Sequence, residues 1–246
     1  MAVVLLDRPD ARNAISGEVA EQLSHAFRAA AESDAWVVIL GATGERSFCV
    51  GADLKERQQL DDAGWMRNRD RIRELFASLR AIPQPTIASV FGHALGGGFE
   101  LALSCDLIVC SDDARFGLPE VRVGLVPGGG GTQLLALKAG PSTAKELIFT
   151  GRQIDAEEAR SLGLVAKVVP RGDLRDATHG LAEEICAASP IAVREAKRAI
   201  DRGLDVPLAD GIDLEDRAWR TAVDTADRRE GVRAFVEKRD PQWRGR

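Results

Sequence analysis

The sequence is poor in the residues that form metal sites and histidine-based catalytic triads. Its 246 residues contain no tyrosine, four cysteines and three histidines, and His25, His93 and His179 are far apart in the chain. No two cysteines have C-x-x-C spacing. We therefore expect no metal site and no histidine-based triad, and we expect the cysteines to be reduced and packed rather than joined in disulfides.

Long apolar runs and an excess of positive charge are also missing. No run approaches the roughly 20 apolar residues of a membrane-spanning helix, and the apolar start at residues 2–6 is too short for a signal peptide. The net charge is −5, which gives no general attraction to nucleic acid or to an anionic membrane. These absences predict a cytoplasmic protein without membrane or nucleic-acid partners.

Short apolar runs alternate with helical stretches through most of the chain. The runs are almost continuously apolar, which is typical of strands covered on both faces. The expected strands are residues 3–6, 36–40, 86–91, 107–110 and 164–169. Helical periodicity occurs in residues 17–32 and 62–80, and Asp155 and Asp227 are expected helix N-caps. Only helices are expected after about residue 173, so the sequence predicts an α/β core over residues 1–185 and a helical region over residues 186–246.

Glu100 follows a glycine-rich junction between an expected strand and an expected helix. Three glycines, Gly96 to Gly98, lead into the helical stretch 99–105. Such a junction presents unpaired N–H groups and the positive end of a helix dipole, and glycine lets a ligand carbonyl come close to the backbone. Glu100 would lie in the first turn of that helix. A tight turn with a glutamate that complements the helix dipole fits the same residues.

Glu120 follows Pro119 and has apolar neighbours on both sides. Apolar surroundings raise the pKa of a carboxyl group, which suits a general acid. An exposed glutamate at a helix start is the alternative. The following run, Gly128 to Gly131, lacks the Lys-Ser/Thr ending of a phosphate-binding loop and the spacing of a dinucleotide fingerprint.

A third glycine turn, Gly51-Ala52-Asp53, comes after a strand-like run and opens another expected helix. The Ala52 N–H can serve as a second backbone donor, whereas Asp53 fits a helix-start carboxylate better than an acid catalyst. Two carboxyl groups and two N–H donors suit a reaction that protonates a carbon next to a carbonyl and stabilises the resulting oxyanion.

Taken together, these segments resemble one family, the crotonase (enoyl-CoA hydratase/isomerase) superfamily. The motifs that carry the resemblance occur in its order and spacing, and they are residues 8–14, 51–56, 94–102, 116–120, 127–133 and 235–239. The resemblance spans nearly the whole chain. It implies an α/β fold with a crotonase-type spiral of ββα units, a C-terminal helical trimerisation region, and assembly as a homotrimer or a hexamer made of two trimers.

The same resemblance implies the roles of individual residues. Glu100 and Glu120 match the two catalytic glutamates, and Ala52 and Gly97 match the donors of the oxyanion hole. The implied contacts to the acyl-CoA thioester are Ala11, Arg12, Ala14, Val50, Asp53, Leu54, Gly96, Pro119, Gly128, Phe235 and Lys238. Of these, Phe235 and Lys238 are expected to reach the coenzyme A of a neighbouring subunit. No metal and no separate cofactor are implied, because coenzyme A is part of the substrate.

The implied reaction is hydration of a 2-enoyl-CoA to a 3-hydroxyacyl-CoA. Double-bond isomerisation or another CoA-ester reaction is the alternative within the family. Several segments look especially like methylglutaconyl-CoA hydratases, a branch linked to RNA through a lysine-rich helix. An RNA-binding role is therefore a further alternative, but the matching segment, residues 22–34, contains no lysine. Residues 56–80 are expected to form a wall of the acyl pocket, where Trp65 and Met66 either shape the pocket or belong to the core.

Overall fold

The chain forms two β-sheets. Three pairs of strands that follow one another in the sequence have the first strand in the larger sheet and the second in the smaller sheet. The computed structural model describes residues 1–246. The larger sheet is parallel and has the order β1 (Ala2–Leu6), β2 (Val38–Ala42), β4 (Thr86–Val90), β6 (Leu107–Ser111) and β9 (Lys167–Val169). The smaller sheet has the order β3 (Ser47–Cys49), β5 (His93–Leu95), β7 (Arg115–Gly117) and β8 (Gln153–Asp155), and within it only β7 and β8 are antiparallel.

Short turns connect the two sheets, from β2 to β3, from β4 to β5 and from β6 to β7. A helical segment follows each pair: α2 (Leu54–Arg57) and α3 (Asp62–Arg80), then α4 (Gly97–Ser104), then the 3₁₀ helix η2 (Pro119–Val123) with α5 (Gly131–Ala139) and α6 (Pro141–Thr150). Because β3, β5 and β7 are parallel neighbours, the residues that follow them meet at one edge of the smaller sheet. All the glycine and glutamate motifs of the sequence lie in these residues.

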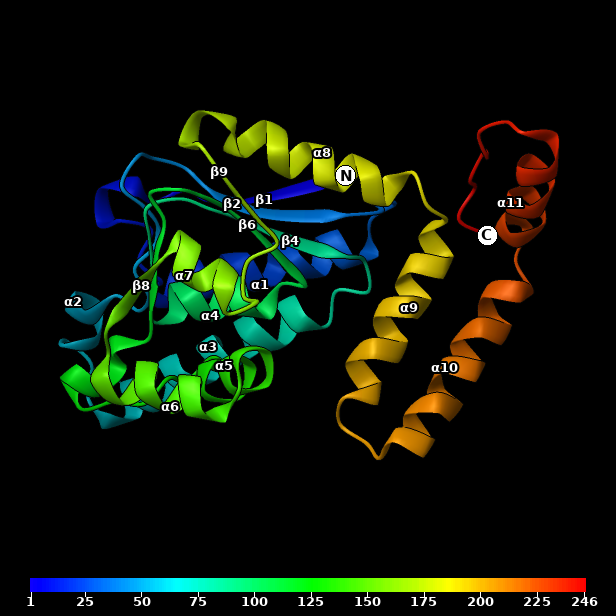
Figure 1. Ribbon diagram of the computed structural model, residues 1–246. Helices are drawn as coiled ribbons and strands as arrows, with labels where there is room; N and C mark the ends of the chain where they lie inside the picture. The colour runs from blue at the N-terminus through cyan, green and yellow to red at the C-terminus, as the bar shows by residue number, and fades with distance from the viewer.

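The central strands of the larger sheet are buried on both faces, whereas Val3 and Leu5 of the edge strand β1 are about half exposed. One continuous core of 37 buried residues joins it to the smaller sheet and to α1 (Gly17–Glu32), α3 and α4. A second cluster of seven buried residues lies on the other face, under α8 (Leu174–Cys186). Successive residues of β2 divide between the two clusters, with Leu40 in the first and Ile39 in the second. Figure 1 shows α8 and α1 on opposite sides of the sheet.

The last three helices extend away from the core. They are α9 (Pro190–Gly203), α10 (Leu208–Val223) and α11 (Ala226–Glu237), and Figure 1 shows them beside the two sheets rather than over them. The terminal residues fold back onto α11, where the Arg246 carbonyl accepts a 2.8 Å hydrogen bond from the Ala226 N–H. None of the helices in the chain combines the length and apolarity that a bilayer crossing requires.

Several expectations from the sequence are confirmed. The helices over residues 17–32 and 62–80 have these bounds, and Asp155 accepts the Glu158 N–H at the start of α7 (Ala156–Ser161). All four cysteines are free, and three of them are buried. Only helices follow residue 173, beginning with α8 at the end of the 3₁₀ helix η3 (Arg171–Asp173).

Other expectations differ from the structure. The second strand lies two residues later than expected, at 38–42, and the expected strand 164–169 is reduced to its last three residues. The four strands of the smaller sheet were not expected, because three residues are too few to show a periodicity. Asp227 is wrong as an N-cap: Thr225 caps α11, while the buried Asp227 carboxylate accepts the backbone N–H groups of Arg244 and Gly245.

Helix α4 packs tightly against β3 at Gly98. A Cβ atom at this position would lie 2.0 Å from the carbonyl oxygen of Cys49. We expect Gly98→Ala to lower the free energy of unfolding by about 3 kcal/mol or more, because two buried backbone segments would have to separate. Urea denaturation measures this loss. Gly180→Ala in α8, where no atom lies within 4 Å of the added Cβ, is the control and should raise stability by about 0.5–1 kcal/mol. Equal stability of the Gly98 variant and the wild type would contradict the packing described here.

Candidate active site

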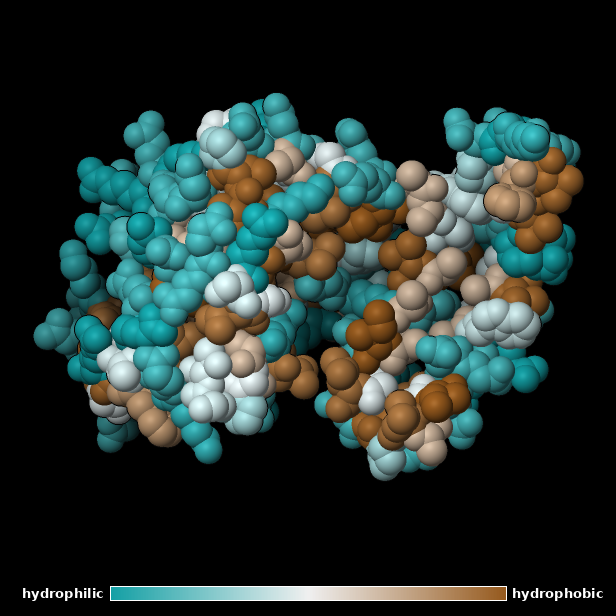
Figure 2. Space-filling model, viewed as in Figure 1, coloured by the Kyte–Doolittle hydropathy of each residue, from teal (hydrophilic) through white to brown (hydrophobic).

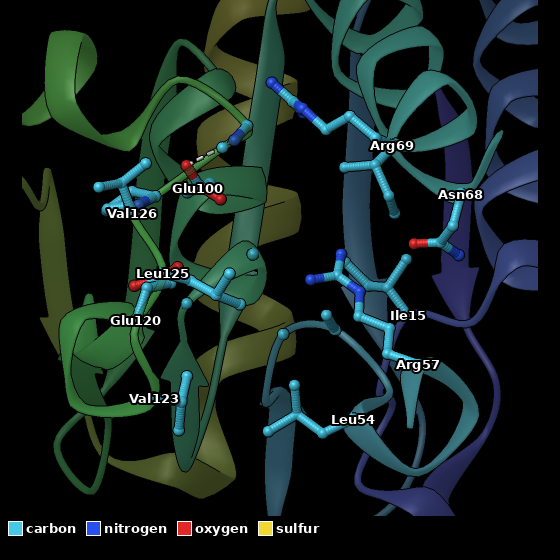
Figure 3. Close-up of a pocket in the computed structure, with 18 of the residues that line it drawn as sticks. Ile15, Leu54, Arg57, Asn68, Arg69, Glu100, Glu120, Val123, Leu125 and Val126 are labelled. Atoms are coloured by element: carbon cyan, nitrogen blue, oxygen red, sulfur yellow. Dashed lines mark hydrogen bonds between the residues drawn. The ribbon is translucent and has the colours of Figure 1, made fainter. Parts of the chain in front are cut away.

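The residues that follow β3, β5 and β7 line a cavity of about 510 Å³. Helix α3 closes its far side with apolar side chains that include Trp65, Ile72 and Phe76. The volume and the mainly apolar lining with a few polar groups are typical of a small-molecule site. Figure 3 shows Glu100 and Glu120 on one wall of this cavity and residues of α2 and α3 on the opposite wall.

Glu100 lies in the first turn of α4, as the sequence predicted, and is only 3% exposed. Its Oε1 atom accepts two backbone hydrogen bonds, from the Gly129 N–H at 2.7 Å and from the Gly131 N–H at 2.8 Å. Burial raises the pKa of Glu100 above its usual value, and these N–H donors oppose the rise by stabilising the carboxylate. The carboxyl group is therefore held in one orientation by two bonds that favour its charged form.

The loop that binds Glu100 is itself held by α3. The Arg80 Nη1 atom, at the end of α3, donates a 2.9 Å hydrogen bond to the Gly129 carbonyl oxygen. Gly129 has no room for a side chain, because a Cβ atom would lie 2.3 Å from the Phe76 ring. The glycine run therefore packs against α3 and presents its N–H groups to a carboxylate of the chain itself.

Glu120 occupies a different environment at the start of η2, directly after Pro119. Burial raises its pKa to about 7, and repulsion from the nearby Glu100 adds to the rise. Its Oε2 atom is buried and has no hydrogen-bond partner. Near neutral pH this carboxyl group can therefore exist in its protonated form and donate a proton, while Glu100 has bonds that favour the carboxylate.

Two backbone amides lie beside these carboxyl groups. The Ala52 N–H forms no hydrogen bond within the chain, and Gly97 is the first residue of α4, where amides lie outside the helical hydrogen-bond ladder. The two segments are in contact: a Cβ atom on Gly51 would lie 3.0 Å from the Gly97 nitrogen. Gly51 and Gly96 have φ angles of 87° and 53°, values that favour glycine.

A network of polar contacts holds the Gly51–Asp53 turn. The Ile15 N–H donates to the Gly51 carbonyl at 2.8 Å, and the Asp53 N–H donates to the Ile15 carbonyl at 3.0 Å. Asp53 caps α2 through its Oδ1 atom, while its Oδ2 atom pairs with Arg8 Nη1 at 2.6 Å. The hydrogen bond from Arg8 holds the pKa of Asp53 below its usual value, so Asp53 is an ionised carboxylate that fixes this turn.

Most of the residues predicted for the site line the cavity. Those that do are Val50, Ala52, Leu54, Gly96, Gly97, Glu100, Pro119, Glu120 and Gly128. Asp53 does not line it, and both of its carboxylate oxygens form hydrogen bonds within the chain. Ala11, Arg12 and Ala14 do not line it either. Ala11 ends the short 3₁₀ helix η1 (Pro9–Ala11), and the loop that follows is adjacent to the cavity, because the Arg12 carbonyl accepts the Val50 N–H at 3.3 Å.

Phe235 and Lys238 lie far from this cavity within their own chain. Phe235 is on α11 and is 85% exposed, and Lys238 ends that helix with a φ angle of 53°. Figure 1 shows α11 at the opposite end of the molecule from α2. The expectation that these residues reach the coenzyme A of a neighbouring subunit stays a prediction.

Three arginines in the cavity lining were missed by the sequence analysis. They are Arg57 at the end of α2, Arg69 on α3 and Arg122 on η2. A signal for Arg69 was present: it lies four residues after Trp65 and three before Ile72, so it shares the helix face of two apolar residues. Trp65 and Met66, left open between pocket and core, both line the cavity, and Met66 is 64% exposed.

Comparisons with known proteins agree with this geometry. The sequence profile of the enoyl-CoA hydratase/isomerase family matches residues 1–246. YngF of Bacillus subtilis (strain 168), provisionally named an enoyl-CoA hydratase/isomerase, is 45% identical over 246 residues, which cover 100% of this chain and 95% of YngF. The mitochondrial methylglutaconyl-CoA hydratase of Homo sapiens is 39% identical over 251 residues, which cover 100% of this chain and 74% of the human protein.

A solved structure gives the same result for the fold. The crystal structure of an enoyl-CoA hydratase from Bacillus anthracis superposes with a TM-score of 0.96 at 41% sequence identity, and the match covers 99% of this chain and 96% of that one. The ββα pairs, the helical C-terminal region and a profile match over the full length all lead to one conclusion. The chain belongs to the enoyl-CoA hydratase/isomerase family and has the crotonase fold.

Proposed function

We propose that this protein is a hydratase that adds water across the 2,3 double bond of a 2-enoyl-CoA thioester. The observation that carries the proposal is the pair of glutamates in one cavity. Glu100 accepts hydrogen bonds from two backbone N–H groups, and burial raises the pKa of Glu120 to about 7. Addition of water needs a base for the water and an acid for the α-carbon. Two carboxyl groups in different environments can supply both.

In this mechanism the water molecule lies between Glu100 and Glu120. Glu100 removes a proton from the water, whose oxygen forms a bond to C3, while Glu120 gives its proton to C2. Negative charge develops on the thioester oxygen, where the amides of Ala52 and Gly97 stabilise it. One such donor is worth about 3 kcal/mol, or about 10²–10³ in rate, and each general acid or base adds about 10²–10⁴.

Coenzyme A enters the proposed reaction only as part of the substrate. Its nucleotide part is assigned to the loop with Ala11, Arg12 and Ala14 and to Leu54, which is 51% exposed at the start of α2. The acyl group is assigned to the cavity lined by α3. Methylglutaconyl-CoA is one candidate substrate, because a relative with 39% identity is named for it.

A homotrimer or a hexamer of two trimers is the proposed assembly. The C-terminal helices support it, because they carry large apolar side chains on their surface: Ile200, Leu204, Leu208, Ile212, Trp219 and Phe235 are all more than half exposed. Figure 2 shows apolar surface gathered over α9 and α10 and at α11. Exposed apolar surface on this scale is typical of an interface between protein chains.

An assay with crotonyl-CoA distinguishes hydration from the main alternative, double-bond isomerisation. Hydration removes the conjugated double bond, so the absorbance of the conjugated thioester should decrease and 3-hydroxybutyryl-CoA should form. An isomerase would leave this absorbance unchanged. The presence of two carboxyl groups in the cavity favours hydration, because an isomerase needs only one carboxyl group to move a proton from one carbon to another.

The first prediction concerns the two glutamates. We expect Glu100→Gln and Glu120→Gln each to lower kcat for crotonyl-CoA by about 10²–10⁴, because an amide can neither accept nor donate the proton. The affinity for a saturated acyl-CoA, measured by calorimetry, should change little. Glu183→Gln, at an exposed position of α8, serves as the matched control. Turnover near the wild-type value in either cavity variant would refute the assigned role.

The second prediction concerns pH. Hydration requires protonated Glu120, whose pKa is raised to about 7, so kcat/KM should fall about tenfold per pH unit above pH 7. It also requires ionised Glu100, whose pKa is raised above 4.5, so activity should fall again in acid, with a midpoint above pH 4.5. A pH profile of kcat/KM for crotonyl-CoA measures both limbs. In Glu120→Gln the residual activity should lack the alkaline limb, and a flat wild-type profile between pH 6 and pH 9 would contradict the assignment.

A further inference from the structure

Two cationic side chains enter the cavity from the wall opposite the glutamates. Arg57 and Arg69 both line it, and Figure 3 shows their guanidinium groups directed from α2 and α3 toward the side that carries Glu100 and Glu120. The Arg57 guanidinium lies 5.3 Å from the centre of the Trp65 ring, and Trp65 is one helical turn before Arg69 on the same face of α3. The two arginines therefore belong to one part of the cavity wall.

Neither guanidinium group has a hydrogen-bond acceptor or an ion-pair partner within the chain. The Nη1 atom of Arg69 is buried and forms no hydrogen bond, and Arg57 forms no side-chain hydrogen bond or ion pair. The third cavity arginine differs, because Arg122 donates two hydrogen bonds, at 3.1 and 2.9 Å, to the Thr150 carbonyl. Arg152 is held by the carboxylates of Glu146 and Glu158. Arg57 and Arg69 thus differ from Arg122 and Arg152 in that no acceptor of the chain is bonded to their guanidinium groups.

Placing these two cations together is unfavourable for the empty protein. Burial lowers the pKa of the Arg57 guanidinium, and the positive charge of Arg69 lowers it further. Arginine nevertheless stays charged. Both side chains are partly buried, and a partly desolvated cation without a hydrogen-bonded partner costs free energy. Part of that cost is recovered when an anion binds between the two groups.

The two glutamates do not serve as that anion. The Oε1 atom of Glu100 is taken by the N–H groups of Gly129 and Gly131. The Oε2 atom of Glu120 has no partner of any kind, arginine included. Cavity residues with acidic side chains are limited to these two. The anion that fits Arg57 and Arg69 must therefore come with the ligand.

We propose that Arg57 and Arg69 bind a carboxylate at the far end of the acyl group, so that the preferred substrate is the CoA thioester of a dicarboxylic 2-enoic acid. This inference rests on the proposed function and extends it to the substrate class. A planar guanidinium group with several N–H donors matches a carboxylate.

The position of Arg69 distinguishes the acyl end from the coenzyme A end. Its Nη1 atom would lie 3.4 Å from a Cβ atom on Gly128, next to the glycines that bind Glu100. The nucleotide is assigned to the other side of the oxyanion amides, along residues 11–14 and Leu54. A group that contacts Arg69 thus lies beyond the reacting carbons, where the acyl chain continues.

Matched pairs of thioesters test the proposal. Glutaconyl-CoA and 2-pentenoyl-CoA have the same chain length, as do 2-hexenedioyl-CoA and 2-hexenoyl-CoA, and only the first of each pair carries a terminal carboxylate. We expect the wild type to prefer the dicarboxylic member in kcat/KM by about 10- to 100-fold, the range for hydrogen bonds to a charged group. Equal values within both pairs, or a preference for the apolar member, would overturn the proposal.

Substitutions assign any preference to the two arginines. Arg57→Met and Arg69→Met should each reduce the ratio by about tenfold or more, and Arg69→Lys should retain part of it because it keeps the charge. Arg67→Met is the matched control, since Arg67 lies on the same helix with a side chain that is 69% exposed. A preference that survives both methionine substitutions would show that other groups bind the carboxylate and would overturn the assignment.

Binding of unreactive thioesters separates this inference from the proposed function. Glutaryl-CoA and pentanoyl-CoA have no double bond to hydrate, so the ratio of their Kd values, measured by calorimetry, reports only on recognition. A protein that hydrates no thioester but binds glutaryl-CoA at least tenfold more tightly would refute the hydratase and leave the carboxylate site intact. If the methionine variants weaken both thioesters equally, the arginines contact the coenzyme A phosphates and the inference fails.

Discussion

The close contact between the start of α4 and the end of β3 is the constraint on which the rest of the site depends. Gly98 lies against the Cys49 carbonyl, and Gly51 lies against the Gly97 nitrogen, with no space for a Cβ at either position. This contact brings two free backbone amides to the same place without any side chain to position them. Because both amides belong to the edges of a packed core, they keep their places when the cavity is empty, which is the condition for efficient electrostatic stabilisation of a transition state.

The two carboxyl groups differ in protonation because only one of them accepts hydrogen bonds from the glycine run. Glu100 accepts two N–H groups from the glycine run, whereas Glu120 has a buried oxygen without a donor. Burial raises the pKa of both groups, but Glu100 has hydrogen bonds that favour its charged form, whereas Glu120 can hold its proton near neutral pH. The glycine run, which lacks the ending of a phosphate-binding loop, binds a carboxylate of its own chain. An anion site at a glycine loop need not be a site for a ligand.

The sequence was sufficient to predict the helices that have a clear hydrophobic periodicity and the candidate residues that lie inside strong motifs. Helices 17–32 and 62–80 and the two glutamates were predicted because periodicity and glycine junctions are local features. The smaller sheet was not predicted, since its strands have three residues each and are defined by their neighbours. The partners of Asp227 could not be read from the sequence, and the place of Arg69 in the cavity was missed although it shares a helix face with Trp65 and Ile72. Asp227 binds a chain end 17 residues away, and Arg69 differs from other surface arginines only in what surrounds it.

The ion pair between Arg8 and Asp53 joins the loop assigned to the nucleotide part of coenzyme A to the turn that carries Ala52. Ordering one of these segments therefore orders the other. Free energy released at the nucleotide, a part of the substrate that takes no part in the chemistry, can in this way be used to fix an amide at the reacting carbonyl. A thioester of a short thiol, with the same acyl group but no nucleotide, would lose turnover as well as affinity. The carrier portion of the substrate would then act as an activator that each substrate molecule brings with it.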